Sequence, residues 1–119
     1  MGASGSSKSG NVDMNGPEAQ LVKDIIHDKT VVVFGKTFCP SCRKVKGLLD
    51  ELNAKYETVE LDRRKDGSQM QAVLGKMTGA STVPRVFIMG ECIGGWDDTE
   101  DLHRKGGLIL KLQDANAIP

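Results

Sequence analysis

The sequence predicts an α/β domain with a four-stranded mixed sheet flanked by helices on both faces. Short apolar runs rich in β-branched residues alternate with segments whose apolar residues recur at helical spacing, in the order αβαβαββα. The length of 119 residues fits one domain. Eight of the first sixteen residues are Gly or Ser, so we expect a disordered tail over residues 1–16 and a domain over residues 17–119.

The first half of the domain is expected to form helix, strand, helix and strand. Pro17 suits the first position of a helix, and the apolar run 31–34 suits a strand buried on both faces. A second strand is expected over residues 56–61. Because a helix joins the two strands, they should be parallel. The face of that connecting helix is marked by apolar residues at i, i+3, i+4 and i+7, namely Val45, Leu48, Leu49 and Leu52.

The second half is expected to form a third helix, two strands and a helical C-terminal segment. Gly79 should end the third helix. The strands at residues 85–89 and 91–93 are too close for a crossover, so they should form a hairpin. Residues 97–114 are expected to be helical, with a break at two consecutive glycines. The buried face of the third helix is expected to contain Met70, Val73, Leu74 and Met77.

Charge and composition exclude several kinds of partner. The 16 Lys and Arg balance the 16 Asp and Glu, so the chain lacks the basic field that nucleic-acid binding needs. No apolar run approaches the ~18 residues of a membrane span, and the tail has no secretory pattern. We therefore expect a cytoplasmic monomer that binds neither nucleic acid nor membrane. The exception would be acylation at Gly2, which fits the pattern M-G-x-x-x-[ST].

Cys39 and Cys42 lie three residues apart at the predicted junction of a strand and a helix. This spacing is compatible with a redox-active disulfide, with half of a zinc site, or with ligation of an iron–sulfur cluster. A structural zinc site needs four ligands, and Cys92, His27 and His103 supply no second close pair, so we expect no metal ligands. Within a βαβ pattern, Cys-x-x-Cys is typical of a thioredoxin-like redox motif.

The two cysteines should have different roles. Pro40 fits the first helical turn, so Cys39 falls at or just before the helix start. The unpaired N–H groups and the helix dipole there favour a thiolate, and Lys36 adds a nearby cation. Cys42 lies one turn into the helix and should be more buried. We therefore expect Cys39 to be the attacking nucleophile and Cys42 the resolving thiol.

Two later motifs could complete a site. Thr82, Val83 and Pro84 precede a strand; the proline is either an ordinary loop residue or forms a cis peptide with Val83 that faces the thiols. In the second case the Val83 backbone is free to pair with an extended, peptide-like substrate. After a Gly-Gly pair, Asp97 and Asp98 open a helix, where carboxylates cap N–H groups. For Asp97 we weigh capping and ligand binding equally.

Taken together, these residues resemble the glutaredoxin family, in its dithiol form with Cys-Pro-Ser-Cys. The resemblance covers about residues 17–115. The matching segments are KTFCPSC (36–42), Gln71, Thr78 with Gly79, TVPRVFI (82–88), and IGG (93–95) followed by Asp97 and Asp98.

The resemblance implies a thioredoxin fold and glutathione-dependent thiol–disulfide exchange. Substrates would be protein–glutathione mixed disulfides, other disulfide-bearing proteins and low-molecular-weight disulfides, with Cys39 forming the mixed disulfide with glutathione. Lys36 and Gln71 would hold the glycine carboxylate of glutathione, and Val83 would pair with its cysteinyl backbone. The γ-glutamyl end would be received by Thr82, Asp97 and Asp98. The implied glutathione-binding residues are Lys36, Gln71, Thr82, Val83, Pro84, Asp97 and Asp98.

Several residues depart from the family pattern or stay open. Ser41 replaces a tyrosine often found between the cysteines, which removes an aromatic wall. Trp96 either contacts substrate or covers the edge of the site. Arg85 follows the proline and is expected to point away from the site. Cys92 is expected to be a small buried apolar residue, with glutathionylation or an intermolecular disulfide as alternatives.

Two other functions stay open. The first is a thioredoxin-like disulfide reductase that ignores glutathione, against which Lys36 and the acidic pair argue. The second is a non-catalytic carrier of a [2Fe–2S] cluster, bridging two chains through Cys39 and external glutathione. Pro40 stiffens the turn and argues against the cluster.

Overall fold

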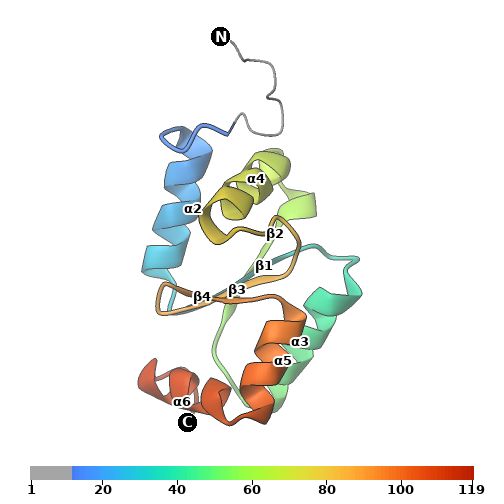
Figure 1. Ribbon diagram of the computed structural model, residues 1–119, viewed down its shortest axis with the longest axis vertical. Helices are drawn as coiled ribbons and strands as arrows, with labels where there is room; N and C mark the ends of the chain where they lie inside the picture. Colours follow the sequence, from blue (N-terminus) through green and yellow to red (C-terminus); the bar gives the residue numbers. More distant parts are fainter. Residues whose placement is uncertain (1–11) are drawn as a thin grey trace.

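The computed structural model describes residues 12–119, whose elements follow the predicted order, with the C-terminal helical segment divided in two (Figure 1). In chain order they are α2 (Pro17–Asp28), β1 (Val31–Gly35), α3 (Pro40–Glu51), β2 (Glu57–Glu60), the 3₁₀ turn η1 (Leu61–Arg63), α4 (Gly67–Thr78), β3 (Arg85–Ile88), β4 (Glu91–Gly94), α5 (Trp96–Arg104) and α6 (Gly107–Asp114).

The four strands form one mixed sheet in the order β2-β1-β3-β4. β1 and β2 are parallel, as predicted, and β3 pairs antiparallel with both β1 and β4. The predicted β3–β4 hairpin turns at Met89 and Gly90, whose φ angles are 50° and 81°. A two-residue hairpin turn of this kind needs positive φ at both positions, which explains the glycine.

Helices cover both faces of the sheet and seal two apolar clusters. α2 and α4 lie on one side, and α3, α5 and α6 lie on the other (Figure 1). Alternate residues of β1 enter different clusters: Val32 and Phe34 pack with α2 and α4, whereas Val31 and Val33 pack with α3 and α6. All five positions of β1 are buried, which confirms the strand predicted to be buried on both faces.

The structure differs from the prediction in several details. β3 ends at Ile88 instead of residue 89, because Met89 enters the hairpin turn, and β2 begins at Glu57 instead of residue 56. β2 ends at Glu60, and Leu61 begins η1 instead of extending the strand, although its side chain stays buried. Met77 is exposed, because it lies in the last turn of α4 beyond the buried stripe through Met70, Val73 and Leu74. Gly79 ends α4 in the left-handed conformation, as predicted.

The start of the described chain packs on the domain. Residues 12–16, which we expected in the tail, include a turn in which the Gly16 N–H donates to the Asp13 carbonyl at 3.1 Å. Val12 and Met14 pack against the cluster between α2 and α4. The expectation for residues 1–11, including acylation at Gly2, lies outside the described residues. Over residues 12–119, no helix combines the length and apolar character that crossing a bilayer would require.

Candidate redox site

Cys39 is the N-cap of α3. Its backbone is extended, with φ −87° and ψ 118°, and its Sγ accepts a hydrogen bond from the Cys42 N–H at 3.2 Å. Pro40 occupies the first helical turn, as predicted. A sulfur in this position meets the unpaired N–H groups and the positive end of the helix dipole. The half-buried side chain of Cys39 still reaches solvent, so this sulfur combines stabilisation of negative charge with access.

Cys42 occupies the opposite environment. Its side chain is fully buried, and all three cysteines are free thiols. Burial, reinforced by the hydrogen bond with Cys39, raises the pKa of Cys42 to about 12. At neutral pH the Cys42 sulfur therefore keeps its proton. Unlike Cys39, it does not reach solvent.

The loop before β3 crosses in front of Cys39. The Val83–Pro84 peptide is cis, which confirms the second of the two predicted forms. The Cys39 thiol points at the Val83 carbonyl oxygen, with 3.9 Å between the sulfur and the oxygen. Upstream, the Gln71 amide of α4 donates to the Ser81 carbonyl at 2.7 Å. The loop is thus fixed from α4 and presents its backbone to the reactive sulfur.

A small hollow of about 200 Å³ opens beside this loop. It brings together most of the residues expected to bind glutathione, but Lys36 and Gln71 do not line it. Lys36 follows β1, and its carbonyl accepts the Cys39 N–H at 3.2 Å. The lining residues are Ser41, Thr82, Val83, Pro84, Arg85, Gly95, Trp96, Asp97 and Asp98.

The two carboxylates at the start of α5 differ in use. Asp98 Oδ2 accepts the N–H of Gly95, the N-cap residue of α5, at 3.2 Å, so capping holds for Asp98. Asp97 is exposed, and its side chain makes no hydrogen bond within residues 12–119. Both Asp97 carboxylate oxygens are therefore free to meet a ligand, whereas one oxygen of Asp98 is used by the cap.

Arg85 lines the hollow, and our expectation that it points away was wrong. Its side chain is buried, and its Nε donates to the Pro84 carbonyl at 3.0 Å. A Cβ on Gly95 would come within 3.0 Å of Arg85 Nη2, so the absence of a side chain at Gly95 leaves space for the guanidinium. The usable signal was a lone cation in an otherwise apolar strand, followed after the next strand by a glycine.

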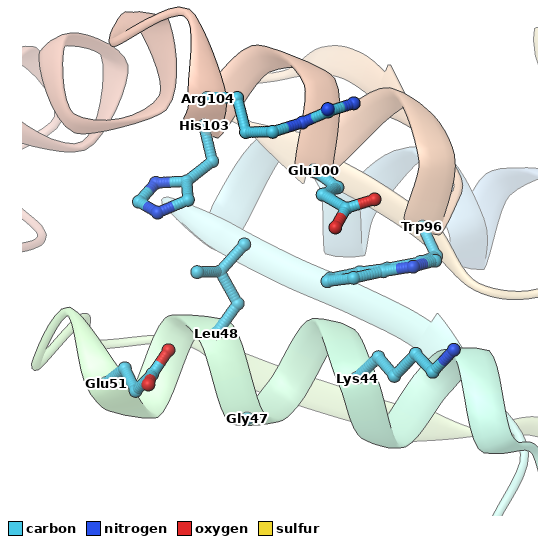
Figure 2. A pocket seen from close by; sticks show the side chains of 8 residues that line it. All are labelled: Lys44, Gly47, Leu48, Glu51, Trp96, Glu100, His103 and Arg104. Carbon is cyan, nitrogen blue, oxygen red and sulfur yellow. The ribbon is translucent and has the colours of Figure 1, made fainter.

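Trp96 separates this hollow from a larger groove between α3 and α5. The groove has a volume of about 520 Å³, and neither Cys39 nor Cys42 lines it. In Figure 2, Lys44 and Leu48 of α3 face Trp96 of α5 across this groove. Lys44 Nζ lies 6.0 Å from the centre of the Trp96 ring, within range of a cation–π contact. Trp96 is thus an edge residue shared by the two cavities.

Cys92 lies on the edge strand β4 and is exposed, so our expectation of a buried apolar residue was wrong. An edge strand carries no neighbour on its outer side, and in β4 only Gly94 is fully buried. Within residues 12–119, no group of three or more His, Cys, Asp or Glu side chains gathers to hold a metal ion.

Three features of the site identify the class of protein. A solvent-facing thiol lies at a helix N-terminus, a buried thiol follows one turn later, and a cis-proline loop crosses in front of them. Together with the β2-β1-β3-β4 sheet, they indicate a thiol–disulfide oxidoreductase of the thioredoxin fold.

Comparison with known proteins agrees with this class. The glutaredoxin family model matches residues 31–93. Glutaredoxin-C2 of Arabidopsis thaliana is 52% identical over 99 residues, covering 83% of this chain and 89% of that protein. A glutaredoxin of Ricinus communis is 50% identical over 96 residues, covering 81% and 94%.

Solved structures agree as well. The crystal structure of a buckwheat glutaredoxin–glutathione complex superimposes with a TM-score of 0.84 at 43% identity, covering 86% of this chain and 93% of that chain. The holo form of glutaredoxin C1 from Populus tremula x tremuloides gives 0.81 at 44% identity, covering 85% and 93%. The chain therefore belongs to the glutaredoxin family of glutathione-dependent oxidoreductases, and the predicted thioredoxin fold is confirmed.

Proposed function

We propose that this protein reduces protein–glutathione mixed disulfides and low-molecular-weight disulfides, with Cys39 as nucleophile and Cys42 as resolving thiol. One observation carries the proposal: the Cys39 sulfur is half-exposed, accepts a helix N-terminal N–H, and faces the Val83 carbonyl beside a polar hollow. A thiolate is the attacking species in disulfide exchange, and the helix N-terminus stabilises it.

The reaction needs two exchanges. The Cys39 thiolate attacks the glutathione sulfur of a glutathionylated protein, so a Cys39–glutathione disulfide forms and the protein thiolate leaves. A second glutathione thiolate then attacks the bound glutathione sulfur, which forms oxidised glutathione and releases Cys39. Stabilisation of the Cys39 thiolate helps the second exchange, because a stable thiolate leaves faster.

The hollow beside Cys39 suits the charges of glutathione, which has two carboxylates and one ammonium group. We assign the ammonium group to Asp97 and Thr82, and the cysteinyl backbone to Val83 beside Pro84. Asp98 supports this end through its cap on Gly95. We add Arg85 for the carboxylate at the γ-glutamyl end, because this buried cation lines the hollow.

Residues outside the hollow would bind the glycine carboxylate of glutathione. One Gln71 amide hydrogen holds the Ser81 carbonyl, and an amide nitrogen carries two hydrogens, so the second can still donate to glutathione. We assign Lys36 to the same carboxylate. In the buckwheat protein named above, glutathione is the bound molecule, which supports a glutathione seat here.

Cys42 opens a second route for disulfide-bearing proteins. Attack by Cys42 on a Cys39–protein disulfide forms the Cys39–Cys42 bond and releases the protein thiol. We propose that the protein acts in this way as a monomer in the cytoplasm, where free thiols such as the three found here persist.

The test is turnover of hydroxyethyl disulfide with glutathione, coupled to glutathione reductase. The wild type and Cys42→Ser should turn over, and Cys39→Ser should not. Coupling to thioredoxin reductase without glutathione gives the contrast, since efficient turnover there would favour a thioredoxin-like reductase. Activity in Cys39→Ser would overturn the proposal.

A further inference from the structure

A carboxylate lies behind the resolving thiol and has no assigned use. Glu60 ends β2, and its Oε2 accepts a hydrogen bond from Lys46 Nζ of α3 at 2.6 Å. The two side chains are only 20% and 24% exposed. The other oxygen, Oε1, is buried and has no hydrogen-bond partner within residues 12–119. A buried oxygen without a partner is costly, so its persistence calls for an explanation.

Gly35 brings this oxygen to Cys42. It ends β1 and pairs with Glu60 across the parallel ladder. A Cβ on Gly35 would lie 3.0 Å from Cys42 Sγ and 3.8 Å from Glu60 Oε1. The sulfur and the unpartnered oxygen therefore border the same small space, and the glycine leaves that space open.

Cys42 needs a proton acceptor close to its sulfur. Burial raises the pKa of Cys42 to about 12, so at neutral pH the thiol must lose its proton as it attacks. The charged and titratable groups that act on Cys42 are Cys39, which disfavours its thiolate, and Lys46, which favours it. Neither the lysine ammonium nor the oxidised Cys39 of a mixed disulfide can accept a proton.

We propose that Glu60, held by Lys46, is the proton acceptor for Cys42 in the resolving step. The inference rests on the dithiol route proposed above. Glu60 takes the thiol proton directly or through one water, and the Cys42 thiolate attacks Cys39 Sγ. The Cys39–glutathione bond breaks as the Cys39–Cys42 bond forms, and glutathione leaves as a thiolate that takes a proton from solvent.

The reverse direction uses the same group. When glutathione attacks Cys39 of the intramolecular disulfide, Cys42 leaves, and protonated Glu60 returns the proton to it. Glu60 then acts as acid instead of base, and Lys46 steadies the carboxylate that results. Electrons pass only between sulfurs in both directions.

The experiment follows the resolving step after the exchange that precedes it. Reduced protein is mixed with one equivalent of oxidised glutathione in a stopped-flow instrument. The first exchange forms the Cys39–glutathione disulfide and releases one glutathione, and release of the second glutathione from Cys39 is then followed from pH 6 to 10. Glu60→Gln keeps the shape and the Lys46 contact but cannot accept the proton. We expect release to slow about tenfold or more near neutral pH and to recover as pH rises.

The matched control is Glu57→Gln on the same strand. Glu57 is exposed and lies 3.6 Å from Lys29 in a surface ion pair, so its loss should leave the resolving rate unchanged. Glu60→Asp, which keeps a carboxylate, should retain part of the rate. A merely structural role for Glu60 would not restore the rate at high pH.

Wild-type release and pH profile in a folded Glu60→Gln protein would overturn the proposal. If that variant does not fold, the wild-type profile decides: a plateau far below the pKa of Cys42 supports an internal acceptor. A rate that rises tenfold per pH unit throughout the range overturns it. Turnover in a Cys42→Ser background reports the proposed function separately, because that route bypasses Glu60.

Discussion

Cys39 and Cys42 lie on opposite sides of the start of α3, which we call the front and the back, and their surroundings give the two thiols different reactivity. In front, Cys39 is half-exposed, caps the helix through its sulfur, and lies against the Val83 carbonyl, which borders a polar hollow. Behind, Cys42 is fully buried next to Gly35, the strand neighbour of the ion-paired Glu60. One helical turn therefore separates a sulfur suited to attack from one kept protonated, and position relative to the helix start decides which is which.

The largest effect should come from removing the front thiol. Cys39→Ser replaces the sulfur nucleophile by a hydroxyl, which is far less acidic than a thiol and a poor nucleophile. We expect turnover in the hydroxyethyl disulfide assay to fall to the uncatalysed background. The control is Cys92→Ser, which removes the exposed thiol on β4 and should leave turnover intact. Equal losses in the two variants would contradict a specific catalytic role for the front thiol.

Removing the back thiol should divide the activities. Cys42→Ser leaves the Cys39 cap, the Val83 carbonyl and the hollow in place, so reduction of a glutathionylated peptide should continue. Reduction of an intramolecular protein disulfide, such as those of insulin, should fall about tenfold or more, since no internal thiol then resolves the mixed disulfide. Parallel loss of both activities would contradict separate roles.

The buried environment of Cys42 should also appear in the pH dependence of stability. Burial raises the pKa of Cys42 from 9.0 to about 12, so above about pH 9 the unfolded chain releases a proton that the folded chain keeps. The unfolded state then binds fewer protons, and the free energy of unfolding falls as pH rises. The stabilisation is full below about pH 9 and is lost toward pH 12, by about 1.4 kcal/mol per pH unit.

Urea unfolding of the reduced protein between about pH 8 and 11 measures this slope. Cys42→Ala should flatten it, even though the variant is less stable at pH 8. Burial and the hydrogen bond to Asp50 raise the pKa of Tyr56 to about 12, so Tyr56→Phe should remove a second part of the slope above about pH 10. An unchanged slope in Cys42→Ala would mean that this thiol titrates normally.

The smallest effects should separate the two carboxylates at the front. Asp98→Ala removes the cap on Gly95 and should cost about 1 kcal/mol of stability. Asp97→Asn leaves the helix start intact and should raise the KM for glutathione severalfold with little change in stability. Thermal unfolding and glutathione titration of the two variants give the comparison. The reverse pattern would move the ligand contact to Asp98.

Much of the fold could be predicted because the local patterns agree with one another. The apolar run in β1, the helical spacing in α3 and the Gly-containing hairpin each required one kind of element. The change from strand to η1 at Leu61 could not be predicted, because a buried apolar residue suits both conformations.

The site was predictable where spacing along the chain determines contact. Cys39, Pro40 and Cys42 fall in one helical turn, so their arrangement followed from the sequence. Arg85 and Glu60 were missed because their surroundings come from distant segments, Gly95 for the first and Gly35 with Lys46 for the second. Space that a glycine leaves for a side chain from a distant segment cannot be recognised from a single sequence.

The most direct test compares three thiols within one molecule. Reduced protein is treated with a small amount of iodoacetamide at neutral pH, quenched at intervals, and the label at each cysteine is measured by mass spectrometry. Cys92, exposed on an edge strand, serves as the internal reference. We expect Cys39 to label faster than Cys92, and Cys42 to stay unlabelled until the protein is unfolded. Labelling of Cys42 as fast as Cys39, or of Cys39 no faster than Cys92, would contradict the division of roles between front and back.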